Sequence, residues 1–169
     1  MPNLKQIVQH RSKLRTTVPE TASGRLYKMA PIPGAYAIAV QYRFKTLTDD
    51  TMKFYSPSFL FHDINFSAKK DASHQLRIEV IKGKFLYANK PSFSSSKVQI
   101  VCTCRDFFYT WWYYNKNEHG VHLGPDLPSY TRKTDTYPAR NPNMTLGCCK
   151  HIIRAIQDMS SEGFLQKWS

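Results

Sequence analysis

Alternation of apolar and polar residues predicts a series of short strands in the N-terminal part of the chain. The clearest strand lies over residues 35–46, where large apolar side chains alternate strictly with small or polar ones. A period of two places the large side chains on one face of a strand, so this segment is expected in the core. Residues 53–67 are rich in aromatic side chains and include Pro57. They predict one or two strands, the first of which ends at the proline.

Two further segments continue this pattern. Residues 75–81 alternate apolar with polar side chains, and Lys82-Gly83-Lys84 predicts a tight hairpin turn into residues 85–87. A serine-rich loop follows, and residues 97–102 predict another strand. Short strands with one apolar face are typical of antiparallel sheets. We therefore expect an α+β fold that begins with an antiparallel β-meander.

The C-terminal half predicts a helix, a long loop and a second helix. Residues 106–117 hold seven aromatic residues and fit a helix with Asp106 as its N-cap, although a continuing aromatic strand remains the alternative. Residues 118–147 are polar and rich in glycine and proline, which predicts a loop of unusual length for a compact domain. Apolar residues then recur at helical spacing from His151 to Met159.

All four cysteines lie at the two ends of the segment that contains this loop. The residues that form a C-x-C … C-x-H pattern are Cys102, Cys104, Cys149 and His151. Three thiols and one imidazole are the ligands that a tetrahedral zinc ion prefers. Cys148 remains an alternative to Cys149, and four buried thiols without a metal remain the alternative to a zinc site. Four protein ligands leave no coordination position for water, so a structural role is expected.

The net charge favours an anionic partner. The chain has 24 Lys and Arg against 12 Asp and Glu, a net charge of +12. Such a charge favours nucleic acid, an acidic protein surface or anionic lipid as a neighbour. Its even spread along the chain argues against one dedicated nucleic-acid patch. We expect no membrane partner, because no apolar run approaches the roughly 20 residues of a membrane helix, and no secretory signal.

The sequence also predicts how the chain is divided. Residues 1–34 are basic and interrupted by prolines, which predicts an extended basic arm. Residues 35–160 are expected to form a single zinc-binding α+β domain, and residues 161–169 an apolar C-terminal tail. The residues expected to contact partner subunits are Arg11, Lys13, Arg15, Trp112, Arg132, Arg140 and Trp168.

No arrangement of residues indicates catalysis. The chain has no phosphate-binding glycine loop and no nucleophile elbow. The carboxylates of Asp106, Glu118, Asp126 and Asp135 show no paired spacing typical of a nuclease. We therefore expect neither an enzymatic activity nor a small-molecule substrate.

The cysteine pattern resembles the SWIM-type zinc motif, in which a β-hairpin supplies the first ligand pair and a helix start supplies the second. A narrower resemblance is to SWIM-like proteins of tailed bacteriophages. It rests on Cys-x-Cys-x-Asp-Phe at residues 102–107, the aromatic stretch at residues 109–114, Asn141-Pro142, Gly147 and Cys-Lys-His at residues 149–151. The segment between the two pairs is longer than in ordinary SWIM motifs.

The resemblance implies a non-enzymatic, zinc-binding structural protein of a tailed-phage virion, in its head, neck or baseplate. Such a protein assembles in the host cytoplasm and docks on other virion proteins. The expected mechanism is that zinc fixes the loop and the last helix, while the arm and the tail engage neighbouring subunits. The alternative is a nucleic-acid-binding SWIM module, which rests on the net charge and on Arg105 and Lys116 beside the aromatic stretch.

Overall fold

The computed structural model describes residues 1–10, 23–48, 51–112, 114–115, 123–124, 141, 143 and 145–166. The strands are β1 (Ser23–Ile32), β2 (Ala37–Thr48), β3 (Thr51–Tyr55), β4 (Ser58–Phe61), β5 (Phe66–Ser67), β6 (Leu76–Ile81), β7 (Lys84–Ala88) and β8 (Val98–Val101). The helices are α1 (Leu4–Val8), η1 (Pro33–Ala35), η2 (Phe107–Trp112) and α3 (Lys150–Ser161). No helix among these residues is both long enough and apolar enough to cross a bilayer.

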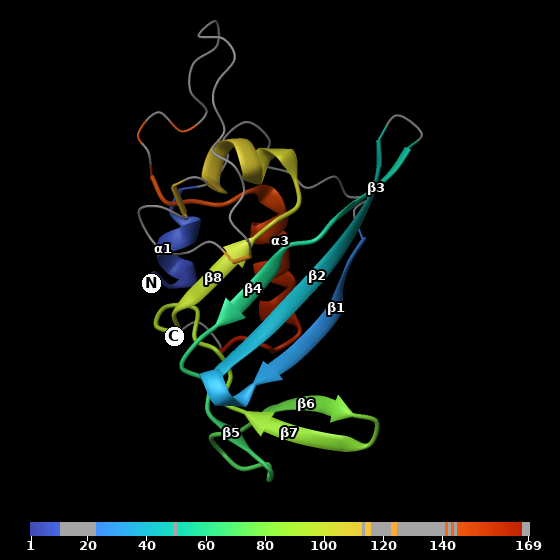
Figure 1. The fold of residues 1–169 in the computed structure, drawn as a ribbon, viewed down its shortest axis with the longest axis vertical. Coiled ribbons are helices and arrows are strands. Elements are labelled where there is room, and N and C mark those ends of the chain that lie inside the picture. Colours follow the sequence, from blue (N-terminus) through green and yellow to red (C-terminus); the bar gives the residue numbers. More distant parts are fainter. Residues whose placement is uncertain are drawn as a thin grey trace, which may run out of the picture.

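The strands form two antiparallel sheets, which confirms the predicted α+β class. A five-stranded sheet has the order β1-β2-β4-β8, and β3 also pairs with β2. A three-stranded sheet has the order β5-β7-β6 and lies at one end of the larger sheet (Figure 1). The predicted single meander is therefore wrong. The chain leaves the first sheet after β4, builds the small sheet and returns as β8 to pair with β4.

Strand β1 contradicts the predicted extended arm over residues 1–34. Ser23–Ile32 pairs with β2 along its length as an edge strand, with a bulge between Leu26 and Lys28. An edge strand tolerates a proline such as Pro31, which cannot donate a backbone hydrogen bond. Near the N-terminus, α1 is closed by a capping box between Asn3 and Gln6 and buries two apolar side chains in the core. Residues 11–22 lie outside the described part.

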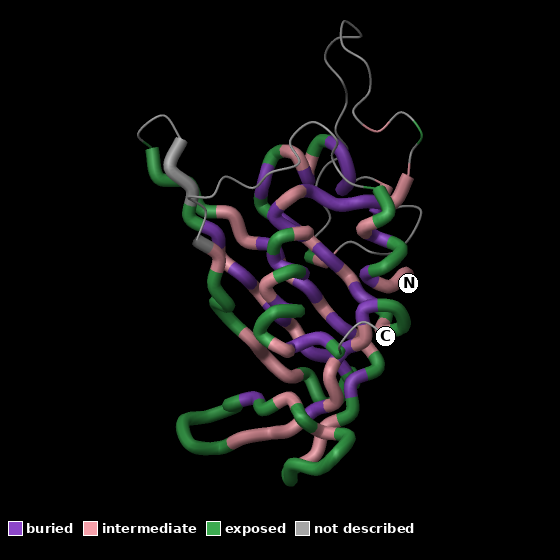
Figure 2. Tube along the Cα trace, turned by 180° about the vertical axis from the view of Figure 1, so that it is seen from behind, coloured by how far each residue is buried: buried purple, intermediate pink, exposed green. Residues whose placement is uncertain are grey.

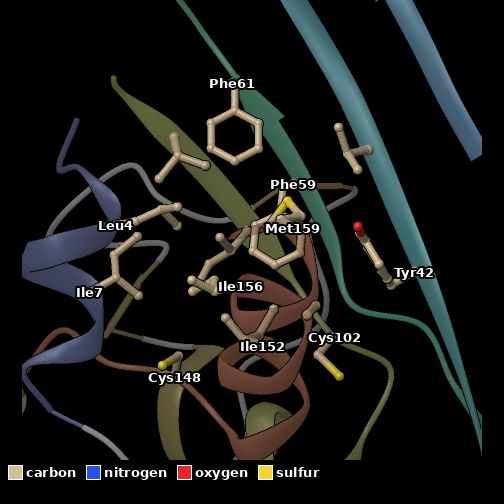
Figure 3. Close-up of a cluster of buried hydrophobic side chains, with 14 of the residues drawn as sticks. Leu4, Ile7, Tyr42, Phe59, Phe61, Cys102, Cys148, Ile152, Ile156 and Met159 are labelled. Atoms are coloured by element: carbon tan, nitrogen blue, oxygen red, sulfur yellow. The ribbon is translucent and has the colours of Figure 1, made fainter. Parts of the chain in front are cut away.

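The main core lies between the five-stranded sheet and α3 (Figure 2). As predicted, the large side chains of β2 face this core, and Ile38, Val40, Tyr42 and Phe44 are at most 1% exposed. Helix α3 buries a stripe at helical spacing, which consists of Ile152, Ala155, Ile156 and Met159. Figure 3 shows Ile152, Ile156 and Met159 of this stripe pointing toward Phe59 of β4. The predicted hairpin at Lys82-Gly83 is also present and joins β6 to β7.

The C-terminal end of α3 is tied to the middle of the sheet. The Tyr42 hydroxyl donates a hydrogen bond of 2.5 Å to Glu162. The chain then reverses at Gly163, whose φ is 72°, and Phe164 and Leu165 are buried against the protein's own core. Phe164 contacts the ring of Phe61, with 5.8 Å between centroids. The described part of the predicted apolar tail therefore packs on the chain itself, whereas Trp168 lies outside the described residues.

We expect Tyr42→Phe to lower the free energy of unfolding by about 1–2 kcal/mol at pH 7, because it deletes a partly buried hydrogen bond to a carboxylate. Burial, followed by the hydrogen bond to Glu162 and its negative charge, raises the pKa of Tyr42 far above its ordinary value of 10.0. The unfolded chain then loses this proton near pH 10 while the folded chain keeps it, so the stabilisation declines above that pH. Urea unfolding at pH 7, 9 and 10.5 should show that the difference in free energy of unfolding between the wild type and the variant becomes smaller as the pH rises. A difference that stays constant would contradict this prediction.

Candidate metal centre

The end of β8 presents the first pair of cysteines. Residues 98–104 alternate in burial, so Cys102 and Cys104 lie on the same buried side as Val98 and Ile100, while Thr103 is exposed. The alternation continues beyond the last hydrogen-bonded residue of the strand. A period of two therefore directs both thiols to the interior, as the spacing predicted.

The start of α3 presents the second pair. Cys149 occupies the N-cap with extended backbone angles (φ −83°, ψ 167°), and His151 lies in the first turn. Neighbouring residues on extended backbone point to opposite sides. Cys148 is accordingly buried beside α1, on the other side of α3 from Cys102 (Figure 3). Of the two adjacent cysteines, the structure brings only Cys149 to the other ligands.

The four predicted ligands meet at one buried point. The three thiol sulfurs and the imidazole nitrogen of Cys102, Cys104, Cys149 and His151 all lie within 4.8 Å of one another. All four residues are at most 4% exposed. Sulfurs bound to one tetrahedral ion at about 2.3 Å lie about 3.8 Å apart, so small side-chain rotations suffice to form such a site. The cluster can therefore hold a metal ion.

His151 is oriented by aromatic rings. Tyr55 of β3 stacks on its imidazole with 4.4 Å between centroids and an angle of 25°. Phe44 of β2 contacts the same ring from a centroid distance of 6.2 Å. The Nδ1 atom of His151 is buried and has no hydrogen-bond partner among the residues that the structure describes. Buried polar atoms are rarely left unpaired, and a metal–nitrogen bond through Nδ1 would satisfy this one.

The thiols interact strongly because they share one buried site. Burial raises the pKa of Cys102 and of Cys149, and the neighbouring thiols raise the latter further. Hydrogen bonds from Cys102 and Cys149 lower the pKa of Cys104, which makes it the first of the three to ionise. Three thiolates in this space would repel one another, and a dication supplies the charge that offsets the repulsion.

Backbone contacts fix the position of the second ligand pair. The buried side chain of Asn115 donates to the carbonyl of Gly147 (2.8 Å) and accepts from its amide (3.2 Å). The amide of Cys148 donates to the carbonyl of His10 at 3.2 Å. A Cβ atom on Gly147 would lie 2.4 Å from the ring of Trp111. Gly147 therefore permits the close packing that places Cys149 at the cluster.

The aromatic stretch after Cys104 is helical, as predicted, and begins at the site. Helix η2 has π-helical hydrogen bonding, and the amide of Phe107 donates to the sulfur of Cys104 at 3.3 Å. Helical backbone already begins at Arg105, directly before η2, so Asp106 is not the N-cap that the sequence predicted; its side chain accepts a hydrogen bond from the Thr110 hydroxyl. The hydrogen bond from the Phe107 amide stabilises a thiolate at Cys104.

The structure tests only one of the predicted partner contacts. Trp112 is 2% exposed and stacks on Phe108, so it belongs to the core and offers no surface to another chain. The remaining predicted contacts lie outside the described residues: Arg11, Lys13, Arg15, Arg132, Arg140 and Trp168. Most of the predicted loop over residues 118–147 lies outside them as well.

Sequence reasoning missed two residues that position the site. Asn115 holds the backbone before the second cysteine pair, and Tyr55 holds the histidine ring. The sequence around neither residue indicates a role at the site, because Asn115 is one of several polar residues near a loop and Tyr55 is one of several aromatic residues in a predicted strand. Both act through contacts between segments that are distant in sequence.

Comparison of the chain with models of protein families, with curated proteins and with solved structures finds no match. The evidence for a metal centre is therefore the geometry of the chain's own residues. The four residues that can hold an ion come from a strand end and a helix start, which are the positions that their spacing indicated.

Proposed function

We propose that the cluster binds one zinc ion and that the ion has a structural role. The observation that carries this proposal is the meeting of four buried ligand atoms from the segment after β8 and the start of α3. Three cysteines and one histidine form a ligand set typical of closed structural zinc sites, which leave no open position for a reacting water. Calcium and magnesium prefer oxygen ligands, and this cluster has none.

The ion would join two segments that are far apart in the sequence. Cys102 and Cys104 follow β8, while Cys149 and His151 start α3, so the intervening segment of more than 40 residues is closed at its base. Closing the ends of a long segment limits the entropy that it gains on unfolding. Zinc would in this way stabilise the packing of α3 on the sheet.

We further propose that the chain is a non-enzymatic component of a tailed-phage virion that docks on neighbouring subunits. The support is the ligand pattern and its flanking residues, which resemble SWIM-like phage proteins, together with a helix start that supplies the second pair. The first pair follows a strand that pairs with β4 rather than with the strand before it, which differs from a simple hairpin.

The metal proposal predicts about one zinc per chain in protein purified under reducing conditions. Native mass spectrometry, with elemental analysis of the same sample, measures this ratio. Replacing zinc with cobalt should also give the intense visible absorption of a tetrahedral thiolate site. Protein that is folded and reduced but holds no zinc, and takes up none when it is supplied, would contradict the proposal.

The virion proposal predicts that the chain remains with phage particles through gradient purification. Quantitative mass spectrometry of the purified particles should find it in a fixed ratio to the major capsid protein. Its recovery only in the particle-free fraction of the infected culture would contradict a virion role, while leaving the zinc proposal intact.

A further inference from the structure

The five-stranded sheet has a second face, turned away from α3, that carries a basic and aromatic surface. Residues paired across strands share a face. Arg25 pairs with Arg43, and Lys45 pairs with Phe54, so these side chains lie on the same face of β1, β2 and β3. They alternate with Tyr42 and Phe44, which point into the core. Figure 1 looks onto this face, with α3 behind the sheet.

An arginine lies between two aromatic rings on this face. The guanidinium of Arg43 is 5.2 Å from the ring centroid of Tyr27 and 4.5 Å from that of Phe54. The rings are nonetheless 54% and 49% exposed. Tyr27 belongs to β1 and Phe54 to β3, so the sheet holds both rings in place. They form a preordered platform, because cation–π contacts restrict the rings without burying them.

The charge of this face has one sign. The strands place four basic residues on it, Arg25, Lys28, Arg43 and Lys45, and the five strands contain no aspartate or glutamate. Asp49 and Asp50, between β2 and β3, lie outside the described residues. A basic surface attracts polyanions, and an exposed ring adds an affinity for flat, unpaired groups.

We propose that this sheet face binds single-stranded nucleic acid. Unpaired bases stack on Tyr27 and Phe54, while Arg25 and Lys45 neutralise the neighbouring phosphates. Exposed aromatics on strands, flanked by cations, provide this combination. Bases in a duplex are already stacked on one another and cannot use the rings, and an acidic peptide would use only the charges. The surface lies across the sheet from the metal centre and is a separate site from it.

Fluorescence anisotropy of the zinc-loaded full chain tests this proposal with a labelled 20-nucleotide oligothymidine. We expect tighter binding of this probe than of a duplex of equal length, with affinity that falls as salt is raised. Polyglutamate should compete poorly. Tyr27→Ala and Phe54→Ala should each weaken binding of the oligothymidine by about tenfold. Arg25→Glu should weaken it too, and this variant keeps both rings should the ring variants fold poorly.

The chain offers a matched control on the β6–β7 hairpin. The guanidinium of Arg77 lies 3.6 Å from the ring centroid of Phe85, so an arginine–ring contact also occurs there. The residue opposite Phe85 on the neighbouring strand is Glu79, whose negative charge disfavours phosphate. Phe85→Ala should leave the affinity for oligothymidine unchanged. The proposal is overturned if Phe85→Ala weakens binding as much as the two sheet variants do. The proposal would also be overturned if the chain bound the duplex or polyglutamate as tightly as the oligothymidine and if Tyr27→Ala and Phe54→Ala had no effect.

Discussion

Replacing Cys149 with serine is expected to abolish stoichiometric zinc binding and to lower the free energy of unfolding by more than about 3 kcal/mol. Cys149 supplies one of the four ligand atoms, is fully buried and starts α3. A hydroxyl is a poor zinc ligand, so the remaining three ligands would hold the ion weakly. The start of α3 would then lose its connection to the end of β8. Zinc content and urea unfolding of the purified variant measure the two effects.

Cys148→Ser is the matched control for this prediction. Cys148 is the neighbouring residue and is also fully buried, so the same substitution buries the same hydroxyl. It does not belong to the cluster. Cys148→Ser should therefore keep one zinc per chain and should still be destabilised by a chelator, whereas Cys149→Ser should not respond to the chelator. Equal zinc loss in both variants would show that burial, and not metal binding, explains the effect.

The parts of the fold that sequence predicted are those fixed by local periodicity. In β2, residues with large side chains occur at every second position, and they are the ones that face the core. The spacing of Cys102 and Cys104 places them on one side of a strand end for the same reason. The stripe of α3 follows from its helical period. Each of these predictions needed only the geometry of a single element.

Strand β1 escaped prediction because it lacks such a period. Arg25, Leu26, Tyr27 and Lys28 are all exposed, and a bulge after Leu26 interrupts the alternation. What makes this segment a strand is its pairing with β2, the next strand along the chain, and not a pattern within the segment itself. The return of β8 to β4, in place of a meander, likewise depends on a pairing between segments that are distant in sequence. Periodicity in one segment cannot specify such a partner.

The metal site likewise has a part that the sequence predicts and a part that it does not. The identities of the ligands followed from their chemistry and spacing, and the geometry of extended backbone separates Cys149 from Cys148. The groups that hold those ligands in place did not follow, because Asn115 and Tyr55 reach the site from other segments. Residues of this kind often affect metal affinity as strongly as a ligand does, so the backbone around Gly147 is the next place to test.

We expect Gly147→Ala to lower the free energy of unfolding by about 3 kcal/mol and to weaken zinc binding by at least about tenfold. A Cβ atom at this position would lie 2.4 Å from a ring carbon of Trp111 and 2.6 Å from the carbonyl oxygen of His10. Trp111 is 5% exposed and cannot move aside without disturbing the core. The backbone must move instead, which strains both hydrogen bonds to Asn115 and displaces Cys149.

Gly34→Ala separates this steric effect from the general effect of adding a methyl group. A Cβ atom on Gly34 would meet no atom within 4 Å, and Gly34 is exposed. That variant should therefore unfold within about 0.5 kcal/mol of the wild type and should retain its zinc affinity. Competition with a chromogenic chelator measures the affinity, and urea unfolding measures the stability. If Gly147→Ala loses stability but binds zinc as tightly as Gly34→Ala does, the contacts of Gly147 support the core alone. If both properties change together, the close approach of Trp111 to Gly147 is what positions Cys149 for the ion.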